Sequence, residues 1–206
     1  MSNKIDVVVV DYNIGNVDSV VKAFKILNCK VVLSNKKEDI LIAKKLVLPG
    51  QGSFDYGMNQ LEVLDIKDLI VKRVLDNNIP ILGICLGMQL FADIGYENLL
   101  NTKGLSFIPG EIKKLNTNLK LPHIGWNEVK IKKDDVIFSK IEDNKDFYFV
   151  HSYYFECKKI ENILSTTNYG YEFPSVVRKN NIFGVQFHPE KSLKNGIQLI
   201  KNFLLL

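Results

Sequence analysis

Residues 79–89 read Ile-Pro-Ile-Leu-Gly-Ile-Cys-Leu-Gly-Met-Gln. The run up to Ile84 is apolar at nearly every position, as in a strand whose two faces are both buried in a parallel sheet. The pattern Gly-x-Cys-x-Gly ends that strand, and an apolar helical pattern begins near Leu86. Small residues on either side of Cys85 let the chain turn sharply and hold the side chain at the edge of the sheet. The stretch therefore predicts a strand, a nucleophile elbow at Cys85 and a helix.

Strands and helices alternate on the N-terminal side of this elbow. Apolar runs predict further strands at Ile5–Val10, Val31–Leu33 and Lys45–Leu48, with a Gly-rich loop after the last of them at Pro49–Gly57. Apolar residues at helical spacing predict helices over Val17–Leu27, around Ile40–Ala43 and from about Met58 to Leu75. Such alternation is typical of βαβ units, so the predicted fold is α/β, with a doubly wound, mostly parallel sheet flanked by helices.

The pattern changes after Ile94, where short extended segments are separated by polar turns. These segments predict antiparallel strands that extend one edge of the sheet: Leu105–Ile108, Glu128–Ile131, Phe147–Phe155, Ile163–Thr167 and Ser175–Arg178. A last strand, Ile182–Phe187, leads into a helix that Ser192 opens. Because no internal repeat or linker interrupts the chain, we expect a single domain over residues 1–206.

Composition excludes several classes of protein. The chain has 206 residues, 46% of them hydrophobic, and its 27 basic and 23 acidic residues leave a net charge of +4. This balance is too mild to indicate a partner that is nucleic acid or a membrane surface. No apolar run approaches the roughly 20 residues that span a bilayer. The three cysteines, Cys29, Cys85 and Cys157, are too few and too far apart for a disulfide framework, so we expect a reduced, cytoplasmic protein.

A second motif supplies the base that a cysteine nucleophile needs. His188 follows the last predicted strand, and Pro189 favours an extended backbone before it, so Glu190 faces the same way as the imidazole. The carboxyl ends of parallel strands meet at one edge of a sheet. We therefore expect Cys85 and His188 to meet although 188 − 85 = 103 residues separate them. The three side chains then have the roles of nucleophile, base and orienting group, and the N–H of Leu86 becomes a natural oxyanion donor. The alternative is a core cysteine and an unrelated histidine in a surface turn.

Two segments carry a resemblance to a known family. Residues 80–90 and 184–192 closely resemble the class I (triad) glutamine amidotransferases. Within that class, residues 11–16, 48–54, 122–127 and 149–154 are similar to the glutaminase subunits of imidazole glycerol phosphate synthase. The resemblance extends over essentially the whole chain.

The resemblance implies hydrolysis of L-glutamine to L-glutamate and ammonia through a thioester on Cys85. His188 is then the general base and acid, and Glu190 holds the useful tautomer of His188. Backbone N–H groups of Leu86 and Gln51 form the oxyanion hole, although the family usually has Val at the position of Gln51. The implied substrate-binding residues are Gly50, Gly52, Gln89, Ser152 and Tyr153.

The resemblance also implies a partner and a pathway. Ammonia passes to a TIM-barrel cyclase subunit, HisF, within a heterodimer of histidine biosynthesis. The residues implied at or near that interface are Asn16, His123, Trp126, Tyr148 and Lys191. No cofactor is implied. Because no third ligand accompanies His123 and His151 at a coordinating spacing, no metal is predicted.

Two alternatives stay open. A paralogous amidotransferase subunit would share the triad but supply ammonia to another acceptor, such as an enzyme that amidates a sugar or a polysaccharide. A non-catalytic docking subunit would keep the fold alone, but an intact set of Cys85, His188 and Glu190 argues against it.

Overall fold

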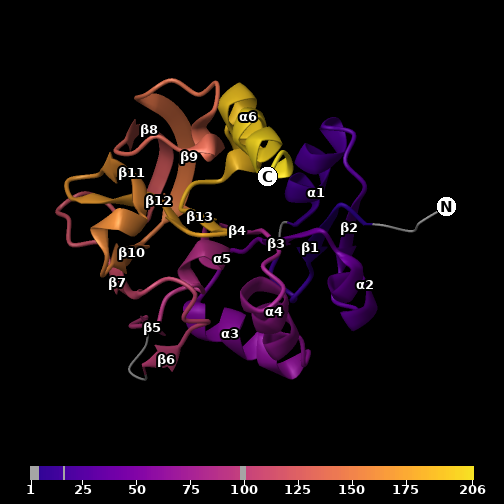
Figure 1. Ribbon diagram of the computed structural model, residues 1–206. Helices are drawn as coiled ribbons and strands as arrows, with labels where there is room; N and C mark the ends of the chain where they lie inside the picture. Colours follow the sequence, from indigo (N-terminus) through magenta and orange to yellow (C-terminus); the bar gives the residue numbers. More distant parts are fainter. Residues whose placement is uncertain (1–4, 16, 98–100) are drawn as a thin grey trace.

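The computed structural model describes residues 5–15, 17–97 and 101–206. Within these ranges the largest sheet has nine strands in the order β2-β1-β3-β4-β13-β12-β11-β8-β9 (Figure 1). The first five of these run parallel: β2 (Val31–Ser34), β1 (Val7–Val10), β3 (Lys45–Leu48), β4 (Ile81–Ile84) and β13 (Ile182–Val185). The other four continue the sheet antiparallel: β12 (Glu172–Lys179), β11 (Ile163–Asn168), β8 (His123–Ile131) and β9 (Lys145–His151).

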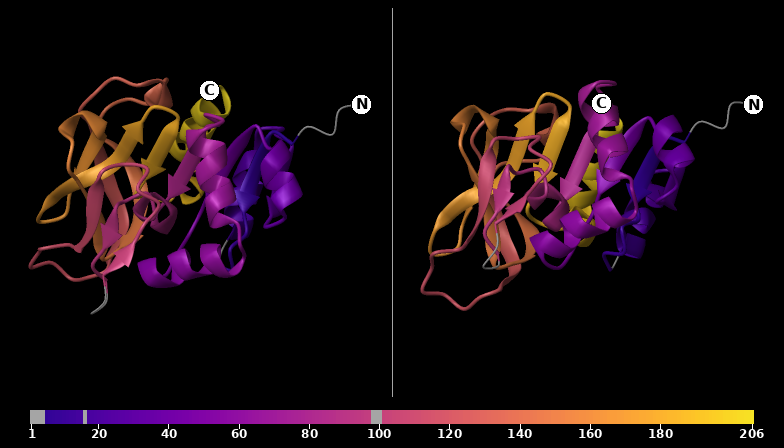
Figure 2. Two further views of the ribbon diagram at one scale, coloured as in Figure 1. Left: turned by 60° about the horizontal axis from the view of Figure 1, so that its bottom comes forward. Right: turned by 90° about the horizontal axis from the view of Figure 1, so that it is seen from below.

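Helices cover both faces of the parallel part, which confirms the predicted doubly wound fold. Figures 1 and 2 show α1 (Val17–Ile26) and α6 (Leu193–Leu204) on one face, and α2 (Lys37–Ile42), α3 (Phe54–Val63) and α4 (Lys67–Leu75) on the other. Alternation along a strand explains the two layers. In β1, Val7 and Val9 belong to the apolar cluster that contains α1 and α6, whereas Val8 and Val10 belong to the cluster that contains α2, α3 and α4.

Part of the predicted antiparallel extension forms a second sheet, which the prediction missed. Its strands are β10 (Tyr153–Cys157), β7 (Gly110–Lys114), β5 (Ile94–Gly95) and β6 (Thr102–Lys103). The prediction of one strand over 147–155 was therefore wrong. The chain leaves the large sheet at the end of β9 and joins the small sheet at Tyr153, and the carbonyl of Ser152 between them accepts a hydrogen bond from the N–H of Leu115 (2.9 Å). Only two polar residues, His151 and Ser152, interrupt the apolar residues at this crossing, and the prediction read through them as one strand.

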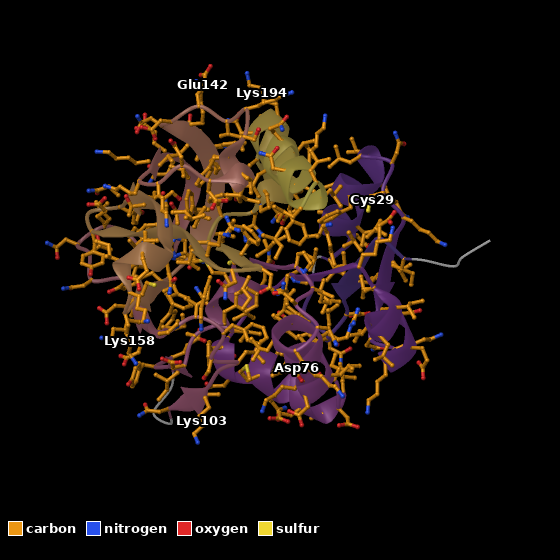
Figure 3. The ribbon with its side chains drawn as sticks, in the orientation of Figure 1. Cys29, Asp76, Lys103, Glu142, Lys158 and Lys194 are labelled. Atoms are coloured by element: carbon orange, nitrogen blue, oxygen red, sulfur yellow. The ribbon has the colours of Figure 1, made fainter. Side chains whose placement is uncertain are left out.

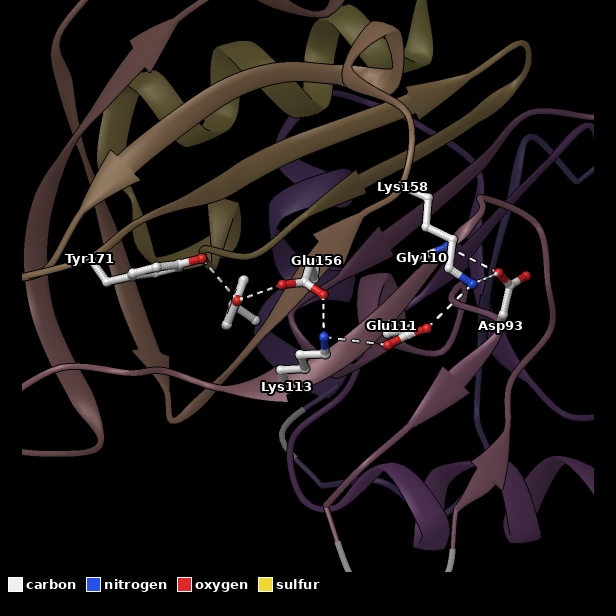
Figure 4. A network of polar contacts seen from close by, with 8 residues as sticks. Asp93, Gly110, Glu111, Lys113, Glu156, Lys158 and Tyr171 are labelled. Atoms are coloured by element: carbon white, nitrogen blue, oxygen red, sulfur yellow. Dashed lines mark hydrogen bonds and ion pairs between the residues drawn. The ribbon is translucent and has the colours of Figure 1, made fainter.

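Ion pairs lie on the outer surface of the small sheet (Figure 4). Lys113 pairs with Glu156 across β7 and β10 and lies 3.5 Å from Glu111. Lys158 contacts both Glu111 (3.4 Å) and Asp93 (3.3 Å), which joins the sheet to the segment that follows the elbow helix. These groups are partly exposed, so their contribution is mainly to the register of the strands, with little effect on stability.

Two other predicted elements differ from the structure. The single helix predicted from Met58 to Leu75 is two helices, because Asp65 between α3 and α4 takes a φ of +52° that a helix cannot accommodate. The strand predicted over 105–108 is a buried loop, in which the N–H groups of Leu105 and Phe107 bond to the carbonyls of Leu90 and Phe91.

The remaining elements are short. The elbow helix α5 covers only Leu86–Gln89, and the 3₁₀ helices are η1 (Val136–Phe138), η2 (Ile160–Asn162) and η3 (Pro189–Lys191). None of the helices in the described ranges has the length and apolar run that crossing a membrane requires.

Candidate active site

Cys85 lies in the sharp turn between β4 and α5. Its backbone has φ +52° and ψ −108°, a strained conformation for a residue with a side chain, and its N–H bonds to the carbonyl of Val185 (2.8 Å). The turn brings α5 so close to β3 that a Cβ atom on Gly87 would lie 1.7 Å from the carbonyl oxygen of Leu48. A Cβ on Gly83 would lie 2.7 Å from the carbonyl oxygen of Gly87. The glycines on both sides of Cys85 are therefore required by the close packing of the elbow.

The helix that follows Cys85 is short. Four residues make a single turn, so the dipole of a long helix is not available to stabilise a charge on the sulfur. What the turn does offer is individual backbone N–H groups at its start, among them that of Leu86. Local hydrogen bonds thus matter more to Cys85 than the field of the helix.

His188 reaches Cys85 because β13 pairs directly with β4, with Val185 opposite Ile84. The His188 Nδ1–H donates to Oε1 of Glu190 at 2.8 Å, and both side chains are only 2% exposed. No nitrogen or oxygen of the described residues bonds to Nε2, the other ring nitrogen, which is buried. Burial works to lower the pKa of His188, but the neighbouring Cys85 sulfur and the Glu190 carboxylate more than offset it and raise the pKa to about 10. The site therefore favours the imidazolium form of His188.

A cavity of about 260 Å³ opens beside the Cys85 sulfur. Seven residues predicted from the sequence line it: Gln51, Gly52, Cys85, Leu86, Gln89, Ser152 and Tyr153. Gly50 lies behind this wall, where an added Cβ would meet the hydroxyl oxygen of Tyr12 at 2.6 Å. The volume suits a small polar molecule, which would meet the sulfur of Cys85 at the cavity wall.

Glu97 is a cavity residue that the sequence interpretation missed. Its carboxylate accepts a hydrogen bond from the N–H of Phe54 at the start of α3. Burial raises the pKa of Glu97, and the bond from Phe54 partly offsets that effect. No motif surrounds Glu97, since only the fold brings the segment after β5 to the cavity. Pro122, Val150 and His151 complete the lining.

Of the five residues predicted at a partner interface, three lie together at the surface, one is buried and one is outside the described residues. Trp126 on β8 is 48% exposed, its ring centroid lies 6.0 Å from that of Tyr148 on β9, and Lys191 Nζ lies 5.8 Å from the Tyr148 ring. We call these three residues the aromatic surface cluster. His123 is buried on the opposite face of β8 from Trp126, with Nδ1 at 3.1 Å from Nε2 of His151. Asn16 lies outside the described residues.

The other two cysteines are separate from this site. Cys29 is half-buried beside β2, on the side of the molecule that carries α1 (Figure 3), and Cys157 ends β10. Burial raises the pKa of Cys29 to about 11 and raises that of Cys157 as well. Both thiols are therefore poor nucleophiles at neutral pH.

Comparison with known proteins agrees with the elbow, the His188–Glu190 pair and the fold. The model of the family described as glutamine amidotransferase class-I matches residues 8–206, so the chain belongs to that family. Its relatives narrow the assignment to the HisH subunits of imidazole glycerol phosphate synthase. The chain is 44% identical over 202 residues to subunit HisH 1 of Campylobacter jejuni, covering 97% of this chain and 100% of that protein. It is 45% identical over 198 residues to subunit HisH of Methanocaldococcus jannaschii, covering 96% and 98%.

Solved structures agree with the fold alone. A putative GMP synthase protein from Thermoplasma acidophilum superposes with a TM-score of 0.74 and 20% identity, covering 99% of this chain and 94% of that one.

Proposed function

We propose that this chain is the glutaminase subunit of an imidazole glycerol phosphate synthase, which hydrolyses L-glutamine and passes ammonia to a cyclase subunit, HisF. The observation that carries the proposal is the buried pair of His188 and Glu190, 2.8 Å apart, next to Cys85 at the wall of the cavity. The full-length similarity to HisH subunits supports the choice of pathway.

The first half of the reaction forms a thioester. The thiolate of Cys85 attacks the side-chain carbonyl carbon of glutamine, and the carbonyl oxygen takes up negative charge that the N–H groups of Leu86 and Gln51 stabilise. The His188 imidazolium gives a proton to the amide nitrogen. The carbon–nitrogen bond then breaks, ammonia leaves, and the C–S bond remains. Glu190 stabilises the charged imidazole throughout.

The second half removes the acyl group. Neutral His188 takes a proton from water while the water oxygen adds to the thioester carbon, and collapse of this adduct breaks the C–S bond. The products are the Cys85 thiolate, an imidazolium on His188 and the side-chain carboxylic acid of the product, which gives its proton to solvent to become glutamate, so the resting state is restored. No cofactor enters either step.

Charge and hydrogen bonding suit the cavity to glutamine. The carboxylate of Glu97 would pair with the α-ammonium group of the substrate, and the side-chain carbonyl of Gln89 would accept a further hydrogen bond from it. Gly52, Ser152 and Tyr153 line other parts of the wall. A polar substrate binds well here because the polar atoms it loses to water find partners.

The aromatic surface cluster would face the cyclase. An exposed tryptophan beside a tyrosine is typical of interface anchors. The carbonyl of Tyr148 accepts a hydrogen bond from the backbone N–H of His188 (2.8 Å), so a single hydrogen bond connects this surface to the proposed base. Ammonia made next to the partner reaches it without dilution in bulk water.

The test is glutamate release by the purified chain, alone and with a HisF cyclase, with and without the nucleotide ligand of that cyclase. We expect release that the liganded cyclase stimulates, and its loss in Cys85→Ala. Cys29→Ala is the matched control and should keep full activity. Unchanged activity in Cys85→Ala would rule out the mechanism. Glutamine hydrolysis that no cyclase stimulates would instead favour a paralogous acceptor, and no hydrolysis at all would favour a docking subunit.

A further inference from the structure

A backbone carbonyl fixes the orientation of two buried amides behind Cys85. The oxygen of Tyr153 can only accept hydrogen bonds, so the Gln89 atom 3.0 Å from it must be the nitrogen Nε2. That same nitrogen lies 3.1 Å from a side-chain atom of Gln186, which must then be the oxygen Oε1. The remaining end of the Gln186 amide is therefore its NH₂ group.

This NH₂ group lies against the reacting sulfur. Gln186 Nε2 is 3.7 Å from Cys85 Sγ, within the range of an N–H···S hydrogen bond, and the Gln186 side chain is fully buried. The backbone of Gln186 is also held, since its N–H donates to the carbonyl of Ser175 (2.9 Å). The amide thus has a protein partner at each end and cannot turn over without breaking both contacts.

The sulfur has a different partner in each of its protonation states. As a thiol, Cys85 can donate to the carbonyl of Val150, which lies 3.8 Å from Sγ. A thiolate has no proton to donate and repels that carbonyl, but it accepts from the Gln186 NH₂ group. A buried anion without donors is costly, so a fixed donor at this place favours the thiolate.

We propose that Gln186 is a further catalytic residue, which donates a hydrogen bond to the Cys85 thiolate and orients Gln89. The same bond stabilises the sulfur again when the thiolate leaves the acyl carbon in the second half of the reaction. Because both hydrogens of the Gln89 amide point to Tyr153 and Gln186, its oxygen stays available to the substrate. The catalytic part of this proposal rests on the glutaminase function proposed above.

Gln186→Met tests the proposal because methionine has a similar length but no amide. The first readout is the rate at which iodoacetamide alkylates Cys85, followed by mass spectrometry over a range of pH. We expect the pH at which the alkylation rate is half-maximal to rise by about one unit or more. A hydrogen bond to a charged group changes an equilibrium constant by about one to two powers of ten. The second readout is glutamine hydrolysis, where we expect kcat to fall about 10- to 100-fold and KM to rise.

Two further variants make the result decisive. Gln186→Glu has the same shape and still accepts from Gln89, but it places a negative charge at the sulfur, so its alkylation profile should move further than that of Gln186→Met. It also decides the question if the methionine variant does not fold. Gln198→Met on α6, where Gln198 bonds to Asn202 (2.8 Å), is the matched control and should leave both readouts unchanged.

An unchanged alkylation profile in folded Gln186→Met, or in Gln186→Glu if the methionine variant does not fold, would overturn the proposal. Failure of the glutaminase function has a different signature. In that case the unsubstituted chain would not hydrolyse glutamine, while the shift in alkylation would still report the contact between Gln186 and the sulfur.

Discussion

At the scale of single residues, hydrogen-bond partners fix the protons on two buried histidines, and one of these partners is the carbonyl that orients Gln89. Nδ1 of His151 lies 2.8 Å from the Tyr153 oxygen and must donate to it. The Asn127 NH₂ group, which also donates to the carbonyl of Asn168 (2.9 Å), donates to Nε2 of His123 (3.2 Å). His123 therefore carries its hydrogen on Nδ1 and donates it to Nε2 of His151 (3.1 Å). Each ring therefore fits this chain of hydrogen bonds only in its neutral form.

Burial favours the same neutral forms. It lowers the pKa of His123 to about 4 and that of His151 to about 3, and the neighbouring His123 and His188 add to the effect at His151. Both values lie below the ordinary 6.5, so the unfolded chain binds more protons than the folded one at mildly acidic pH. Stability from these residues is present above pH 6.5 and is lost as the pH falls.

We predict that the free energy of unfolding falls as the pH is lowered from 6.5. The slope should reach at most about 1.4 kcal/mol per pH unit for each histidine, and it should be clearest above about pH 5, where carboxyl groups do not yet titrate. His188 works in the opposite direction near pH 6.5, because its raised pKa keeps it protonated in the folded chain while it is only half protonated in the unfolded chain, and this contribution levels off toward pH 5. Urea unfolding at a series of pH values measures this slope.

His123→Phe provides the comparison. Phenylalanine keeps an aromatic ring against Phe149 and Tyr169 but removes one titrating group. The variant will be less stable overall because Nε2 of His151 loses a donor. Its free energy of unfolding should nevertheless change less steeply with pH than that of the unsubstituted chain. Equal slopes would mean that His123 is not held neutral.

The sequence could predict the residues whose chemistry is set by neighbours along the chain. Cys85 lies between close glycines, and His188 and Glu190 are two residues apart on an extended segment. Gln186 is two residues before His188 and shares its face, so the same periodicity could have placed it in the site. Glu97 could not be predicted, because only the small sheet brings it to the cavity.

At the scale of elements, the elbow depends on how closely β3, β4 and α5 pack. Gly87→Ala would place a methyl group 1.7 Å from the carbonyl oxygen of Leu48. Neither the Leu48 carbonyl nor the main chain of residue 87 can move aside, because both are backbone. We predict a loss of about 3 kcal/mol or more in the free energy of unfolding, or failure to fold. Denaturant unfolding of the variant measures the loss.

Gly15→Ala is the matched control, because an added Cβ there meets no atom within 4 Å. It should change the free energy of unfolding by less than about 1 kcal/mol. If both variants were equally stable, the close packing at the elbow would not be what requires glycine at position 87.

Element type could be predicted for the parallel part because each strand there is a single apolar run between helices. Boundaries failed where one apolar pattern continued across a change of structure. Only the polar pair His151 and Ser152 marks the passage from β9 to β10, although the two strands belong to different sheets. The break between α3 and α4 is set by the backbone conformation of Asp65, which apolar spacing does not report.

At the scale of the whole molecule, three hydrogen bonds connect Tyr148 of the aromatic surface cluster to His188 of the candidate active site. The carbonyl of Tyr148 accepts from the N–H of His188, and the N–H of Tyr148 donates to the hydroxyl of Ser192 (3.0 Å). The Ser192 hydroxyl in turn donates to the carbonyl of His188 (2.6 Å). A partner that shifts β9 would therefore shift His188, which gives the proposed cyclase a direct mechanical connection to the base.

Trp126→Ala should weaken binding of a HisF cyclase, since an exposed tryptophan at the centre of an interface is commonly worth about 2 kcal/mol, or roughly 30-fold in Kd. Titration calorimetry measures the affinity. Glutamine hydrolysis by the isolated variant should stay unchanged, because Trp126 lines no part of the cavity, whereas stimulation by the cyclase should require higher concentrations. Ile160→Ala, at an apolar side chain that is 84% exposed on η2, controls for loss of surface hydrophobicity. If Ile160→Ala weakened binding as much as Trp126→Ala, the interface would have to include η2, and the cluster of Trp126, Tyr148 and Lys191 would lose its assignment as the docking surface.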